Sequence, residues 1–234
     1  MRRLALVLCL ALGAVPAFVR AQSHTVSLRA ADGTSLVATL YQPSQRPASA
    51  VVLLHMLTRS RRDWDVTAER LRQAGFVVLA PDLRGHGDSS GSAGSVTDLT
   101  VLLQDAQAAV SYVRAYPGVR PEGIGLAGAS LGASLAAMVA GADPSVDSLA
   151  LLSPSLDYRG LRCEAAMRKY GNRPALLVAA VHDPYAVRTV KHLAAGGSNR
   201  HVLMTEVAGH GTVLLSRDPP LVDHLVDWFR RTLL

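Results

Sequence analysis

The chain has 234 residues, of which 49% are apolar and 18% charged, with a formal net charge of +6 and two cysteines. This length fits one domain, and the apolar fraction excludes a disordered chain. Two cysteines are too few for a small fold held together by disulfides. The positive charge by itself suggests a nucleic-acid partner, and the N-terminus changes that interpretation.

The N-terminus has the pattern of a secretory signal peptide. Arg2 and Arg3 precede an apolar run over residues 4–15, and Ala21 comes just before a polar start. This run is shorter than the roughly 20 apolar residues of a transmembrane helix. We expect cleavage after Ala21, with an uncleaved anchor or a shifted cleavage site as the alternative. The predicted segments are a signal peptide (1–21) and one domain (22–234). We expect an exported protein, periplasmic or secreted, without stable membrane insertion.

Removal of residues 1–21 takes away three arginines and no acid, which lowers the formal charge from +6 to +3. No block of five or six like charges remains, so we expect no nucleic-acid partner. The mature chain keeps one cysteine, Cys163, which has no partner for an intramolecular disulfide. We expect it to be an ordinary helix residue.

From residue 24 onward, predicted strands alternate with predicted helices. A tight turn at Asp32 and Gly33 joins the first two strands, because this dipeptide suits the positive φ of a hairpin. Continuous apolar runs predict buried strands, and apolar residues at helical spacing predict the helices. The expected strands are 24–29, 36–41, 50–54, 76–80, 124–127, 146–152, 175–181 and 201–207. The expected helices are 63–74, 98–116, 131–140, 158–170, 185–195 and 218–233.

This alternation predicts an α/β domain with a mostly parallel sheet of about eight strands and helices on both faces. The first two strands must be antiparallel, because only a short turn joins them. In such sheets, reactive groups gather at the carboxyl ends of the strands. We therefore expect the catalytic residues in the loops that follow the strands.

Residues 128–132 match the pattern G-x-S-x-G between a predicted strand and a predicted helix, with Ser130 at the centre. This arrangement is typical of a nucleophile elbow, a strained turn that lifts the serine oxygen above the sheet. A second match, at residues 87–91, has Ser89 at its centre. It lies in a stretch rich in glycine and serine with no immediate helix, so we favour Ser130 as the nucleophile.

A serine nucleophile needs a base, and the best candidate is His210, between two glycines in the loop after the last predicted strand. The order of serine, acid and histidine along the chain is the order expected for this architecture. Four other histidines compete for this role but are less well placed. They are His55, His86, His182 and His201.

The candidate acid is Asp183, at the end of the predicted strand 175–181. An aspartate followed by proline is also an ordinary helix N-cap, and one residue can serve both purposes. Asp157, after the preceding strand, is the alternative acid. For the oxyanion, we expect one donor to be the backbone N–H of Leu131, directly after the nucleophile, and the second to be that of Leu57.

Together these residues resemble the α/β-hydrolase superfamily over nearly all of residues 25–234. The matching stretches are residues 53–55 before a loop ending in Trp64, residues 81–89, the Ser130 elbow, Asp183 and residues 209–211. The small, lidless esterases similar to dienelactone hydrolase are the nearest group, although that enzyme has a cysteine nucleophile. The resemblance implies an eight-stranded sheet, a Ser-Asp-His triad and no cofactor.

Two departures from the superfamily bear on the site. Met56 occupies a position where relatives usually have glycine, so a positive φ there would strain the backbone by about 1–2 kcal/mol. The stretch between the sixth and seventh strands has room for one helix and no cap. We therefore expect an open site that accepts short or exposed esters.

Three arginines, Arg59, Arg61 and Arg62, lie at the expected mouth of the site, just before a helix start where positive charge is disfavoured. They form either a solvated loop or a site for an acidic group on the substrate.

The predicted activity is that of a serine carboxylic-ester hydrolase acting on a small-molecule ester. The alternatives are a thioesterase, a peptidase or a non-catalytic binding protein, and the sequence predicts no oligomeric state.

Overall fold

The computed structural model describes residues 23–91 and 99–234, so the predicted signal peptide and its cleavage site lie outside the described residues. The strands are β1 (Ser23–Arg29), β2 (Ser35–Tyr41), β3 (Ala48–Leu54), β4 (Val77–Pro81), β5 (Val119–Ala129), β6 (Val146–Leu152), β7 (Ala175–Ala180) and β8 (Arg200–Thr205). The helices are α1 (Asp65–Gln73), α2 (Leu102–Ala115), α3 (Leu131–Ala142), α4 (Cys163–Tyr170), α5 (Pro184–Ala194), α6 (Val213–Arg217) and α7 (Pro219–Leu233). Two short 3-10 helices, η1 (Arg61–Trp64) and η2 (Leu99–Val101), lie near the starts of α1 and α2.

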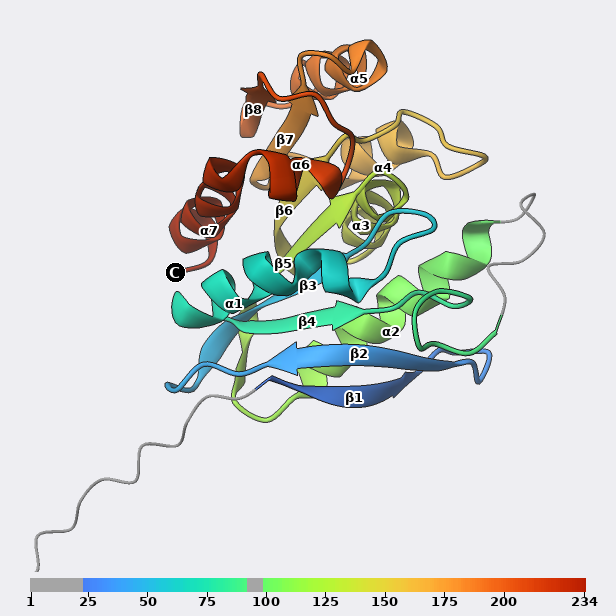
Figure 1. Cartoon of the computed structure of the whole chain (residues 1–234), viewed down its shortest axis with the longest axis vertical. Helices are drawn as coiled ribbons and strands as arrows, with labels where there is room; N and C mark the ends of the chain where they lie inside the picture. The colour runs from blue at the N-terminus through green and yellow to red at the C-terminus, as the bar shows by residue number, and fades with distance from the viewer. Residues whose placement is uncertain (1–22, 92–98) are drawn as a thin grey trace, which may run out of the picture.

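All eight strands form one sheet in the order β1-β2-β4-β3-β5-β6-β7-β8 (Figure 1). The pairs β1–β2 and β2–β4 are antiparallel, and the other pairs are parallel. This confirms the predicted eight-stranded, mostly parallel sheet. Parallel strands need covering on both faces, which explains why β3, β4 and β7 are mostly apolar and fully buried.

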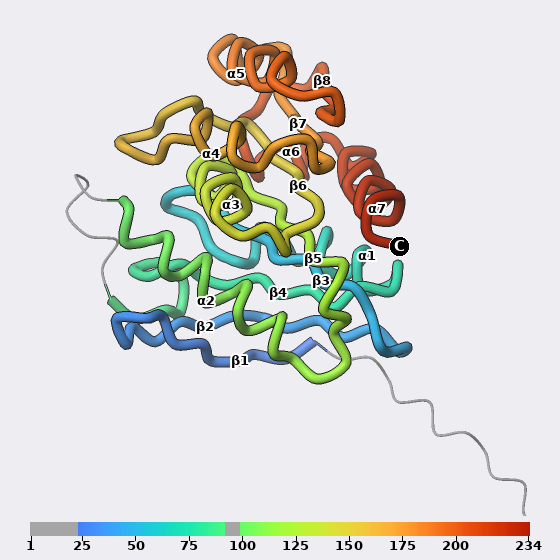
Figure 2. Tube along the Cα trace, turned by 180° about the vertical axis from the view of Figure 1, so that it is seen from behind, coloured from blue at the N-terminus to red at the C-terminus, as the bar shows by residue number. Residues whose placement is uncertain are grey.

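The helices form a layer on each face of the sheet. Helices α1, α6 and α7 pack on one face, and helices α2, α3, α4 and α5 pack on the other (Figures 1 and 2). Helix α7 shows how the sequence determines this packing, because its buried residues, including Leu221, Leu225 and Phe229, recur every four residues. No helix in the described ranges is long and apolar enough to span a membrane.

The connection between β6 and β7 differs from its prediction. The expected helix 158–170 is shorter, because α4 begins only at Cys163 and Tyr158 pairs with Leu161 in a tight turn. Arg159 and Gly160 at the tip of this turn both have positive φ, which a helix cannot accommodate. The connection holds this one helix and no cap, as predicted.

Cys163 is a buried free thiol at the start of α4, and burial raises its pKa to about 12. A thiol with so high a pKa is unreactive near neutral pH, because the thiolate is the nucleophile. Its role is therefore packing.

Candidate active site

Ser130 lies in the sharp turn between β5 and α3, with φ 51° and ψ −110°. Its N–H donates to the carbonyl oxygen of Leu152, 2.9 Å away at the end of β6. A side chain at Gly128 would overlap the backbone of Gly132, and one at Gly132 would overlap the carbonyl of Leu54. The two glycines of the motif are therefore required for the close approach of α3 to the sheet.

His210 lies between Ser130 and Asp183. Its Nε2 is 2.9 Å from the Ser130 Oγ, and its Nδ1 is 2.6 Å from Asp183 Oδ2. In the tautomer that satisfies both contacts, Nδ1–H donates to the carboxylate and Nε2 accepts from the serine hydroxyl. The His210 side chain is 45% exposed and that of Asp183 16%. The three residues thus form a hydrogen-bonded chain that is open to solvent at the histidine.

Asp183 makes two hydrogen-bond contacts at once. While Oδ2 contacts His210, Oδ1 accepts from the N–H of Ala186, 3.0 Å away, and caps the N-terminus of α5. Asp183 can cap the helix and contact His210 at the same time because its two carboxylate oxygens face different partners. The alternative acid, Asp157, is exposed and accepts instead from the N–H of Gly160 in its own loop.

The loop that carries His210 is held by hydrogen bonds from the two residues that follow the histidine. The N–H of Gly211 donates to Ser153 Oγ at 3.0 Å, and the Thr212 hydroxyl donates to Asp63. Gly211 has φ 58°, and a Cβ there would lie 2.8 Å from Met56 Sδ. The site residues predicted from the sequence did not include Ser153, Asp63 or Thr212. Ser153 could have been found, because it is a polar residue directly after a buried strand, where site residues gather.

The side of the site expected to bind the oxyanion is formed by α3 and the loop after β3. The N–H of Leu131 is in the first turn of α3 and so has no acceptor within the helix. Leu57 lies in a turn in which the Arg59 N–H donates to the carbonyl of Met56. The positive φ of this loop occurs at Thr58 (62°) rather than at Met56, so Met56 carries no left-handed strain.

The competing histidines are engaged elsewhere. His55 is fully buried, donates from Nδ1 to the Met56 carbonyl and accepts the Leu83 N–H at Nε2. Burial lowers its pKa to about 4, so it stays neutral at pH 7. His86 bonds the carbonyl of Arg84. His182 is exposed, and His201 lies on β8 beside the Trp228 ring.

The second G-x-S-x-G match is structural. Ser89 Oγ donates to the carbonyl of Asp82 at 2.7 Å and accepts the N–H of Val37 at 2.9 Å. These bonds fasten the loop to β2. The hydroxyl thus has a local structural role distinct from that of Ser130.

The expectation that Arg61 belongs to a solvated loop or a substrate site is wrong. Its side chain is only 8% exposed and forms ion pairs with Asp82 and Asp88. Arg59 pairs with Asp63, and Arg62 is exposed. The sequence pattern could not show this, because Asp82 and Asp88 come from the loop after β4 and meet Arg61 only in the folded chain.

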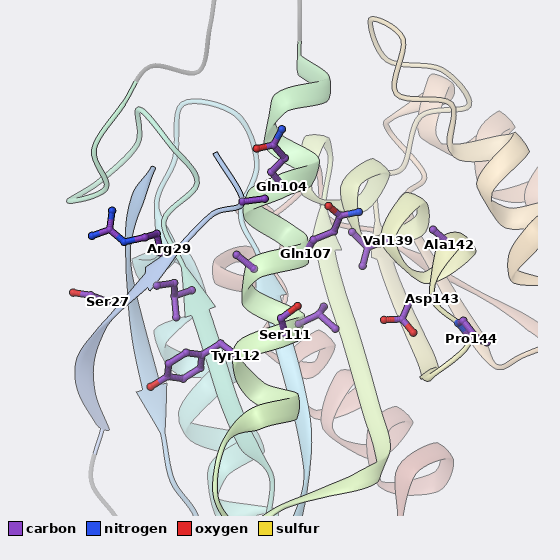
Figure 3. Close-up of a pocket in the computed structure, with 14 residues that line it drawn as sticks. Ser27, Arg29, Gln104, Gln107, Ser111, Tyr112, Val139, Ala142, Asp143 and Pro144 are labelled. Carbon is purple, nitrogen blue, oxygen red and sulfur yellow. The ribbon is translucent and has the colours of Figure 1, made fainter. Parts of the chain in front are cut away.

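A groove of about 780 Å³ lies away from the triad, between β1, α2 and α3 (Figure 3). Its lining residues include Arg29, Gln104, Gln107, Tyr112 and Asp143. Neither Ser130 nor His210 lines it, so this groove is separate from the candidate triad. In residues 23–91 and 99–234, no three histidine, cysteine, aspartate or glutamate side chains gather as a metal site requires.

Comparison with curated proteins gives partial matches. The chain is 31% identical to mouse monoglyceride lipase over 126 residues, which is 53% of this chain and 41% of that protein. It is 33% identical to the monoacylglycerol lipase of Mycolicibacterium smegmatis over 73 residues, 31% of this chain and 26% of that protein. The matched segments thus span less than half the length of these relatives.

Solved structures match over almost the whole chain. An esterase of Pyrococcus furiosus superposes with a TM-score of 0.75 at 18% identity, covering 96% of each chain. A dienelactone hydrolase of Anabaena variabilis has a TM-score of 0.76 at 19% identity, covering 92% of this chain and 100% of that one. At these identities the similarity concerns the fold.

The family model described as serine aminopeptidase, S33, matches residues 45–224. These residues make up more than half of the chain and include Ser130, Asp183 and His210. The chain belongs to this family of α/β hydrolases.

Proposed function

We propose that this protein is a serine hydrolase that cleaves carboxylic esters through an acyl-enzyme. The observation that carries the proposal is the continuous chain of contacts from Ser130 Oγ through His210 to Asp183. The names of the matched relatives, monoglyceride lipase and monoacylglycerol lipase, agree with an ester substrate.

The geometry supports the following reaction. His210 Nε2 takes the proton of Ser130 as Oγ attacks the ester carbonyl. Asp183 holds the required tautomer and stabilises the imidazolium. The N–H groups of Leu131 and Leu57 are the proposed donors to the oxyanion. His210 then protonates the departing alcohol. In the second half-reaction His210 takes a proton from a water molecule that attacks the acyl-serine, and returns it to Ser130 Oγ as the acid departs.

We propose short or exposed esters as substrates. The connection between β6 and β7 contains only α4, so it contributes no cap that would enclose a long acyl chain. His210 is nearly half exposed, which fits a site that substrates reach directly from solvent. No cofactor is needed for this chemistry.

Thioester or peptide cleavage on the same triad is the second candidate, favoured by the family description, which names an aminopeptidase. All three reactions use the same nucleophile and base, and the leaving group distinguishes them. A panel of p-nitrophenyl esters, thioesters and peptide anilides decides between these activities. We expect the highest kcat/KM with a short-chain ester.

A fluorophosphonate probe tests whether the protein is an enzyme or a binding protein on the same scaffold. We expect covalent labelling that is lost in Ser130→Ala and kept in Ser89→Ala, the matched change at the other motif. Absence of labelling in the parent, or persistent labelling of Ser130→Ala, contradicts the proposed nucleophile.

Export is a separate proposal, supported by the basic start and apolar run of residues 1–21. Purification from the native host followed by N-terminal sequencing tests it. We expect the first residue to be Gln22. An N-terminus at Met1 or Arg2 contradicts cleavage.

A further inference from the structure

Ser153 adopts an unusual backbone conformation directly after β6. It has φ 49°, in the left-handed region that favours glycine. It is only 2% exposed, and its N–H donates to the carbonyl of Val178 on β7 at 2.8 Å. Non-glycine residues keep such a conformation where the surrounding structure enforces it, often near a functional site.

The side chain of Ser153 reaches the loop that carries the catalytic base. Its Oγ accepts the N–H of Gly211 at 3.0 Å, in a buried contact between residues 58 positions apart. The peptide plane that includes this N–H also includes the Cα of His210. The bond therefore restrains the point from which the imidazole side chain extends.

We propose that Ser153 is a positioning residue that holds the backbone of His210 so that Nε2 stays within reach of Ser130 Oγ. This inference rests on the proposed function, because it assumes that His210 is the base. Thr212, which bonds Asp63, fastens the same loop one residue further on and through a side chain. Ser153 differs in acting on the peptide directly attached to His210.

The choice of serine over glycine supports this role. Glycine would adopt φ 49° without strain, yet it would leave the buried Gly211 N–H without its acceptor. Alanine would lose the acceptor and retain the strain. Ser153 therefore provides a hydroxyl at a position where backbone conformation alone favours glycine.

The test compares Ser153→Ala with Ser153→Gly. Both remove the acceptor, and we expect the glycine variant to have the higher melting temperature because it relieves the left-handed strain. We expect both to lower kcat for a p-nitrophenyl ester by about 10- to 100-fold, with KM changed less than about threefold, since small displacements of catalytic groups reduce rates on this scale. Fluorophosphonate labelling should slow by a similar factor in both.

Ser155→Ala is the matched control, since it removes another hydroxyl of the same loop, one that bonds the hydroxyl of Tyr185 at 2.7 Å. We expect parental kcat. If kcat instead follows melting temperature, so that Ser153→Gly retains full activity, the role is only structural and the proposal is overturned. Ser130→Ala separates the two proposals. If it is inactive while both Ser153 variants are normal, only the positioning role fails, whereas an active Ser130→Ala refutes the triad itself.

Discussion

Acidification should destabilise this protein through His55, a histidine that is fully buried at the end of β3. Burial, together with the nearby His86, lowers its pKa from 6.5 to about 4, although the Met56 carbonyl, Asp82 and Asp63 oppose the shift. Between pH 6.5 and 4 the unfolded chain binds a proton at this histidine and the folded chain does not. Stability is therefore lost as the pH falls through this window.

The expected loss follows from the pKa difference. At about 1.4 kcal/mol per pKa unit, protonation of His55 in the unfolded chain lowers the free energy of unfolding by about 3 kcal/mol at pH 4 relative to pH 7. This corresponds to a decrease of roughly 6–12 °C in melting temperature for a chain of this size. Hydrogen bonds from Arg59 and Thr212 lower the pKa of Asp63 against the opposing effect of burial, and those from Arg114 and Ser145 do the same for Asp143. The stability that these carboxylates contribute is lost from about pH 5 downward, as they become protonated in the unfolded chain.

The assay is urea unfolding at intervals between pH 7 and 4 for the parent and for His55→Gln, which does not titrate. We expect the variant to be less stable at pH 7, because a buried pair of hydrogen bonds is perturbed, and the gap to narrow by about 3 kcal/mol toward pH 4. His224→Gln, at an exposed position on α7, is the control and should leave the pH dependence of the parent unchanged. Parallel curves for the parent and His55→Gln would refute the reasoning.

Four further changes test the site and the core. Asp183→Asn should lower kcat by about 10⁴-fold, because the wrong tautomer of His210 is stabilised, whereas Asp157→Asn should retain activity in the same ester assay. Gly211→Ala should lower kcat by at least about 100-fold, since a Cβ at φ 58° meets Met56 Sδ and displaces His210; normal turnover would contradict this close contact. Arg61→Met should reduce the free energy of unfolding by about 3–5 kcal/mol, because it removes the cation paired with the buried Asp82 carboxylate, which then keeps only backbone N–H donors; urea unfolding at pH 7 measures this loss. Ser134→Ala should be neutral or stabilising in the same measurement, because its buried hydroxyl has no hydrogen-bond partner among the described residues.

Much of the fold was predictable because its signals are local. The apolar runs of β3, β4 and β7 and the four-residue recurrence in α7 both reflect burial, which the sequence records directly. The predictions missed the first five residues of β5 and the short helix α6, and one predicted helix was too long because a turn competes with it. At residues 158–162, apolar spacing predicted helix, and the positive φ values of Arg159 and Gly160 produce a turn instead.

The site was predictable to a similar extent, and for a similar reason. The elbow around Ser130 is a local motif, and the glycines beside His210 mark a loop with unusual backbone conformation. Arg61 gave no such local signal. Arg59 pairs with Asp63 in its own segment, but Arg61 pairs with Asp82 and Asp88 from another segment, and a sequence window around it cannot show that these charges become buried together.

The sequence by itself determined the alternation of strands and helices, and with it the parallel sheet and the edge at which loops gather. It also determined the chain order of the proposed nucleophile, acid and base. Only the tertiary structure decided that Asp183, and not Asp157, meets His210, and that Ser153 accepts a hydrogen bond beside it. Hydrophobic periodicity indicates whether each residue is buried. The hydrogen-bond partner of a polar atom, in contrast, depends on the strand register and on the paths of loops that are tens of residues apart in the sequence.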